Sequence, residues 1–109
     1  MVSNHGGRQL DSVTASIDAL PAIVDSVGSK LTILIDSGFR RGSDIVKALA
    51  LGANAVLLGR ATLYGVSAGG QEGVERALDI LGDEVRTVIT LLGCSTVSEL
   101  GRHHIERHV

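Results

Sequence analysis

Two short apolar runs, Leu31–Ile35 (LTILI) and Ala55–Leu58 (AVLL), restrict the fold of this chain more than any other feature. Each run is followed at once by glycine and polar residues, which end it sharply. Continuous apolar runs of this length are typical of strands that are covered on both faces, as the strands of a parallel sheet are. The segments around them have the apolar spacing of helices, so the sequence predicts an α/β fold.

The first predicted helix lies within Ser12–Ser29, where apolar residues recur at intervals of three and four. Ser16 is a candidate N-cap, and Gly28 is expected to end the helix. Pro21 fits only if it falls in the first turn, because proline has no backbone N–H to donate.

The second half of the chain predicts a loop and then a long helix. Ala61–Gly73 contains four glycines and is expected to be a loop. Val74–Leu92 is amphipathic and predicts a helix that ends at Gly93, with a bend at Gly82. A short last turn is expected within Ser95–Leu100.

Near the start of the chain, His5 and Arg8 stand three positions apart with two glycines between them. Val2–Ser3 has the character of the end of a buried strand, so the pair is expected on a strand-to-helix loop, where α/β proteins keep their chemistry. Imidazole is a common general base, and guanidinium binds a carboxylate through two parallel hydrogen bonds. The pair suits a substrate with a carboxylate beside a group that loses a proton. The alternative is a loop histidine and a solvated arginine.

Both predicted strands are followed by glycine and arginine. After the first strand comes Arg40–Gly42, and Ser43 or Asp44 is expected to cap the helix that follows. Guanidinium groups and the free N–H groups of a helix N-terminus together bind anions, although Asp44 mildly opposes one. After the second strand come Gly59 and Arg60. The repetition predicts a phosphate site built from two strand-end loops, and the alternative is a pair of solvated loops.

Three segments of the chain resemble motifs of the FMN-dependent α-hydroxy acid dehydrogenase and oxidase family. They are Ser3–Asp11 (SNHGGRQLD), Asp36–Asp44 (DSGFRRGSD) and Leu57–Gly65 (LLGRATLYG), in the family's order and at compatible spacing. The run Asp36–Gly52 is most similar to the (S)-mandelate dehydrogenase branch. The resemblance implies FMN-dependent oxidation of an L-2-hydroxy acid, such as mandelate or lactate, to the 2-oxo acid.

The resemblance also implies a role for each residue that matches a family motif. His5 is implied to be the catalytic base, and Arg8 is implied to bind the substrate carboxylate. The residues implied to bind FMN are Ser3, Asp36, Ser37, Gly38, Phe39, Arg40, Gly59 and Arg60.

The fold implied by the resemblance is a TIM (β/α)8 barrel. The chain matches the end of strand six, units seven and eight, and the closing helix. A complete barrel has about 250 residues, whereas this chain has 109. We therefore expect residues 1–109 to form a partial FMN hydroxy acid dehydrogenase domain of a longer, homo-oligomeric enzyme. Other family contacts, including the aspartate that pairs with the base histidine, are implied to lie outside this stretch, so we expect little turnover from these residues alone.

Composition excludes several other classes of protein. The net charge of −2 leaves no electrostatic footprint for nucleic acid. We expect no secretory signal, and no apolar run approaches the roughly 18 residues of a membrane span. The lone Cys94 is expected to be a small buried residue, which fits a cytoplasmic protein. Longer family members are either soluble or attached to a membrane by an inserted segment.

The C-terminal tail holds three of the four histidines, His103, His104 and His108. No closed set of metal ligands is visible there, so we predict no metal site and a solvated, frayed terminus.

Two hypotheses for function follow. In the first, the chain is part of an FMN-dependent 2-hydroxy acid dehydrogenase or oxidase, and the pair of His5 and Arg8 favours it. In the second, it is a non-catalytic half-barrel that binds FMN or another phosphate ligand, or associates with another chain.

Overall fold

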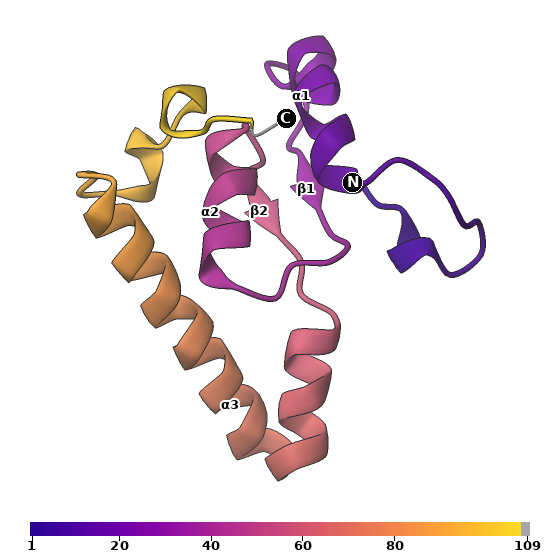
Figure 1. The fold of residues 1–109 in the computed structure, drawn as a ribbon, viewed down its shortest axis with the longest axis vertical. Helices are drawn as coiled ribbons and strands as arrows, with labels where there is room; N and C mark the ends of the chain where they lie inside the picture. The colour runs from indigo at the N-terminus through magenta and orange to yellow at the C-terminus, as the bar shows by residue number, and fades with distance from the viewer. Residues whose placement is uncertain (108–109) are drawn as a thin grey trace.

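The computed structural model describes residues 1–107 of the chain. Two short strands lie beside helices, and the longest helix folds back on itself in two arms (Figure 1). The helices are α1 (Ser16–Val27), α2 (Gly42–Ala50) and α3 (Arg60–Leu91), the strands are β1 (Leu34–Ile35) and β2 (Ala55–Val56), and short 3-10 turns span His5–Gly7, Val97–Glu99 and Arg102–His104.

The sheet is parallel, which confirms the predicted α/β arrangement. β1 pairs with β2 in parallel, and Val2 forms a parallel bridge with Ile35 on the other side of β1. The Val2 N–H donates to the carbonyl oxygen of Leu34 at 2.7 Å. Val2 is therefore the end of a third strand, as predicted, and three neighbouring strands point the same way.

The sheet is covered on one face only, so the predicted burial on both faces is wrong. On one face Ile33 and Ile35 are buried in a core with residues of α1 and α2, whereas on the other face Ala55 and Leu57 are exposed. Because successive strand residues point to opposite faces, helices on one side leave the other side open. The strands are also shorter than predicted. The Ile33 N–H donates to the Asn54 side chain at 2.7 Å instead of joining the β1–β2 ladder.

Helix α1 begins and continues differently from the prediction. Its N-cap is Ala15, and Ser16 is its first residue. The Ser16 hydroxyl points into the sheet end and donates to the carbonyl oxygen of Asp36 at 2.6 Å, so it does not cap the helix. Pro21 lies beyond the first turn, and the helix continues through it. The carbonyl of Ile17 thereby loses its partner within the helix.

Helix α3 replaces the loop predicted for Ala61–Gly73. It begins at Arg60, and the backbone breaks only at Gly69 and Gly70, where Gly70 has φ 59° and ψ −133°. Figure 1 shows the two arms meeting at a sharp corner. The predicted bend at Gly82 is absent. The helix turns at Gly69 and Gly70 instead, where Gly70 has a positive φ that glycine adopts without strain.

The C-terminal segment is described through Arg107, and Arg102, His103, Glu106 and Arg107 are exposed, as expected of a solvated end, while its fraying stays a prediction. Cys94 is buried and a short turn follows it at Val97–Glu99, both as predicted. The Arg102 guanidinium donates to the Asp25 carboxylate of α1 at 2.7 Å. His108 lies outside the described residues.

Two further features of residues 1–107 concern metal ions and membranes. Neither the tail histidines nor any other His, Cys, Asp and Glu side chains in this range gather into a group of three that could hold a metal ion. None of the helices in the same range combines the length and the hydropathy that a membrane crossing requires.

Candidate functional site

A cavity of about 580 Å³ lies where the three parallel strands end. One loop from each strand contributes to it. The lining residues are His5, Gly6, Arg8, Asp36, Ser37, Gly38, Phe39, Arg40, Leu57, Leu58, Gly59, Arg60 and Leu63. The structure thus brings together every residue that the family resemblance implied for the site except Ser3, whereas Arg41 and Gly42 of the predicted anion site lie outside the cavity lining.

Ser37 joins the first two loops of the cavity. Its Oγ accepts hydrogen bonds from the N–H groups of Asn4 at 3.3 Å and Gly6 at 3.4 Å, and donates to Oδ1 of Asp36 at 2.7 Å. The φ of Ser37 is 81°, a left-handed value that non-glycine residues rarely adopt. Strained backbone of this kind gathers at functional sites.

Asn4 was missed by the sequence reasoning. Its Oδ1 accepts from the Gly6 N–H at 2.9 Å, which closes a turn within the histidine loop. The signal was present, because asparagine followed two positions later by glycine is typical of turns of this kind.

His5 and Arg8 lie on the outer rim of the cavity. Both are exposed, and His5 has φ 54°. Within residues 1–107, no hydrogen bond reaches the His5 imidazole or the Arg8 guanidinium, so both heads are available to a ligand. Ser3 lies outside the cavity lining, and its Oγ accepts the His5 N–H at 3.1 Å. Ser3 therefore supports the backbone of the histidine.

The N-cap of α2 lies two to three residues earlier than predicted. Arg41 is the N-cap and Gly42 the first helical residue, not Ser43 or Asp44. Asp44 is the third helical residue, and its carboxylate accepts the N–H groups of Arg40 at 3.3 Å and Arg41 at 3.1 Å. A carboxylate at this position stabilises the first turn and the helix dipole.

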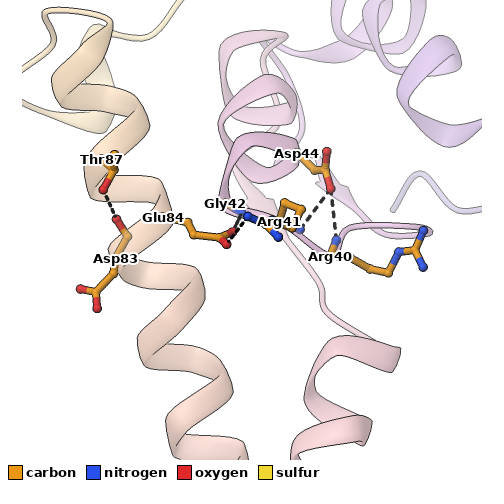
Figure 2. Close-up of polar contacts among 7 residues, drawn as sticks. All are labelled: Arg40, Arg41, Gly42, Asp44, Asp83, Glu84 and Thr87. Atoms are coloured by element: carbon orange, nitrogen blue, oxygen red, sulfur yellow. Dashed lines mark hydrogen bonds and ion pairs between the residues drawn. The ribbon is translucent and has the colours of Figure 1, made fainter.

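A second carboxylate, from α3, also occupies the N-terminus of α2 (Figure 2). Glu84 accepts the Gly42 N–H through Oε2 at 2.6 Å, and its Oε1 lies 2.9 Å from the Arg41 guanidinium. The amides that were expected to attract an anion are thus already bound by the chain's own carboxylates. Arg40 differs from Arg41, because its side chain extends away from Glu84 and lines the cavity.

The N-terminus of α3, by contrast, carries no side-chain cap. Gly59 is the N-cap, and the first intrahelical bond runs from the Leu63 N–H to its carbonyl at 3.2 Å. The N–H groups of residues 60–62 therefore have no acceptor within the helix. A Cβ at Gly59 would meet nothing within 4 Å, so the cavity is open at this point. Free amides beside Arg60 fit a phosphate group.

Apolar side chains form the remaining wall of the cavity, and the sequence reasoning did not single them out. They are Leu57, Leu58 and Leu63, from the end of β2 and the first turn of α3. Leu57 is 40% exposed, because it alternates with Val56 and points away from the core. An apolar wall beside charged groups is typical of sites that bind a flat organic ligand.

The comparisons with known proteins agree with this site. The family model described as FMN-dependent dehydrogenase matches residues 1–107, and the chain belongs to this family. An L-lactate oxidase of Nostoc sp. is 52% identical over 100 residues, which cover 92% of this chain and 27% of that protein. An L-lactate dehydrogenase of Xanthobacter autotrophicus is 50% identical over 109 residues, which cover 100% of this chain and 28% of that protein.

A solved structure has the same arrangement. A soluble mutant of the membrane-associated (S)-mandelate dehydrogenase from Pseudomonas putida superposes with a TM-score of 0.94 at 48% identity, covering 98% of this chain and 30% of that one. The family predicted from the three motifs is therefore confirmed. The chain spans less than a third of the length of each of these relatives.

Proposed function

We propose that this chain forms the C-terminal part of a TIM-barrel enzyme that oxidises an L-2-hydroxy acid to the 2-oxo acid with FMN. The observation that carries the proposal is the single cavity in which His5, Arg8 and an uncapped helix N-terminus meet. The three parallel strand ends correspond in order to the end of strand six and to strands seven and eight. The lactate and mandelate enzymes among its relatives support a substrate of that kind.

The FMN phosphate is proposed to bind at the N-terminus of α3. Gly59 leaves room for it, Arg60 supplies charge beside the free amides, and Arg40 faces the same cavity from the preceding loop. Asp36 and the segment Ser37–Phe39 line the cavity between this point and the histidine loop, where the rest of the flavin would lie.

His5 and Arg8 are proposed to act on the substrate. Oxidation of a 2-hydroxy acid to the 2-oxo acid removes two electrons and two protons. Arg8 binds the substrate carboxylate through its guanidinium, and the His5 imidazole accepts one of the two protons. FMN, when bound, would take up the two electrons together with the other proton. The apolar side chains of Leu57 and Leu63 border the same space and restrict water.

The second candidate is a phosphate-binding piece without turnover of its own. It is favoured by the exposed His5 side chain, because no carboxylate within residues 1–107 is hydrogen-bonded to the imidazole. A base without an orienting partner is weak. Formation of 2-oxo acid from lactate or mandelate by the purified chain, abolished in His5→Ala, would exclude this candidate.

The experiment that tests FMN binding compares FMN with riboflavin, which lacks the phosphate. We expect the purified chain to quench flavin fluorescence with a clearly lower Kd for FMN, and Arg40→Ala and Arg60→Ala to reduce the difference by about tenfold each. Lys47→Ala is the matched control, because Lys47 lies on α2 outside this cavity. Equal affinity for the two flavins would refute the proposed phosphate site.

Three expectations about the longer enzyme stay predictions. They are its homo-oligomeric state, a cytoplasmic location, and membrane attachment, where it occurs, through a segment other than this chain. The membrane-associated (S)-mandelate dehydrogenase among the similar structures supports membrane attachment of some relatives, without indicating the segment responsible.

A further inference from the structure

The two adjacent arginines after β1 have different surroundings. Arg41 is paired with Glu84 at 2.9 Å, whereas Arg40 lines the cavity. The backbone N–H groups of both are held by Asp44. The direction of Arg40 therefore depends on how the Phe39–Gly42 segment is fixed, and the strongest contact that reaches this segment from another element comes from Glu84.

Glu84 is placed to fix that segment. Its side chain is only 25% exposed, and one carboxylate spans two groups, the Gly42 N–H at 2.6 Å and the Arg41 guanidinium at 2.9 Å. Bonds of this kind, with a charged acceptor, are about twice as strong as neutral ones. Figure 2 shows the carboxylate reaching across from α3 to the start of α2.

Gly42 is packed tightly against Glu84 and Val85 of α3. A Cβ on Gly42 would collide with the Cβ of Glu84 and would lie 2.5 Å from the backbone nitrogen of Val85. Gly42 is buried. The two helices therefore approach closely at Gly42, which places the Glu84 carboxylate beside the α2 N-terminus.

We propose that Glu84 is a positioning residue for the phosphate site: it holds Arg41 and Gly42 on α3 and so directs Arg40 into the cavity. Because Glu84 neutralises the charge of Arg41, Arg40 is the guanidinium of this loop that has no ion-pair partner within residues 1–107. The inference rests on the proposed binding of FMN. It implies that the second arm of α3 supports the phosphate site through Arg41 and Gly42, without lining the cavity itself.

The test measures the ratio of the riboflavin Kd to the FMN Kd for the full 109-residue chain and its variants. We expect Glu84→Ala to lower this ratio by about tenfold. Glu84→Gln restores most of it, since its amide oxygen still accepts the Gly42 N–H. Asp83→Ala is the control, because Asp83 is one position away on the same helix and its side chain pairs with Arg86 only.

Each outcome decides the proposal. A wild-type ratio in Glu84→Ala, or an equal loss of affinity for both flavins, would overturn it, because a purely structural role weakens riboflavin and FMN alike. If Glu84→Ala is unfolded by circular dichroism, Glu84→Asp decides, since it keeps the charge but falls one methylene short of Gly42. A wild-type ratio in Glu84→Asp would then overturn the proposal. A wild-type chain without preference for FMN would refute the phosphate site itself.

Discussion

Gly65 and Gly73 lie back to back where the two arms of α3 diverge. A Cβ on Gly65 would stand 2.6 Å from the carbonyl oxygen of Gly73, which is closer than any side chain can approach a backbone without displacing it. Contact between these two backbones, together with the break at Gly69 and Gly70, determines how tightly the helix folds back. The corner then directs the second arm, and Glu84 with it, toward α2.

The first prediction concerns this corner. Gly65→Ala should lower the free energy of unfolding by about 1–3 kcal/mol, because the added methyl group forces the two arms apart. The matched control is Gly82→Ala on the second arm, where a Cβ meets only the Arg86 guanidinium at 3.8 Å. That control should raise stability by up to about 1 kcal/mol through helix propensity. Urea unfolding followed by circular dichroism gives both values, and equal effects would contradict the prediction.

The second prediction concerns the bond between the first two cavity loops. Ser37→Ala removes the acceptor for the N–H group of Asn4, and should cost about 1 kcal/mol. Amide hydrogen exchange at Asn4 should become faster, whereas the Gly6 N–H keeps its shorter bond to the Asn4 side chain. Ser26→Ala serves as control, because the Ser26 hydroxyl donates only to the Ala22 carbonyl on the surface of α1. Unchanged exchange in Ser37→Ala would show that Ser37 does not hold the histidine loop.

The third prediction concerns the C-terminal segment. Arg102→Ala should release residues 101–107 from α1, because Arg102 donates to both Asp25 and the carbonyl of Pro21. The pair is exposed, so global stability should change by less than about 1 kcal/mol. Limited proteolysis should instead cut this segment faster. Arg107→Ala, which loses only a 3.5 Å contact with Asp18, should leave the cleavage rate unchanged.

The fourth prediction concerns the apolar residues that the structure leaves uncovered. Leu63 is 58% and Tyr64 61% exposed on the first arm of α3, so the purified chain should associate as its concentration rises. Leu63→Ser and Tyr64→Ser should shift light scattering toward the monomer. Val97→Ser is the control, because Val97 is also exposed but lies outside α3. A wild-type chain that remains monomeric at high concentration would contradict the prediction.

The strand ends and the site could be predicted because their signals are local. A short apolar run followed by Asp36-Ser37-Gly38 or by Gly59-Arg60 reports a strand and its loop within a few residues. The partial burial of the sheet was missed, because the open face depends on which elements pack beside it and not on Ala55 or Leu57 themselves.

Other features depend on contacts that sequence patterns do not contain. The sequence predicts a loop for Ala61–Gly73, which includes the first arm of α3, because this segment contains four glycines and its apolar residues do not lie along one face of a helix. The bond from Gly42 to Glu84 joins positions that are 42 residues apart, and those from Ser37 to Asn4 and Gly6 span 33 and 31 residues. The helix start at Gly42 follows from such a contact, since Ser43 and Asp44 have the better local capping chemistry.

The contact between Glu84 and Gly42 also orders events during synthesis. Within this stretch a ribosome makes the histidine loop and the arginine loop before α2, and the only carboxylate then available to the arginine loop in the described contacts is Asp44, which binds the N–H groups of Arg40 and Arg41. The second carboxylate arrives only after 42 further residues have been added. The nascent chain thus carries a loosely held arginine loop until the second arm of α3 emerges and docks. A pause in translation before that point prolongs the interval in which this loop is unsupported.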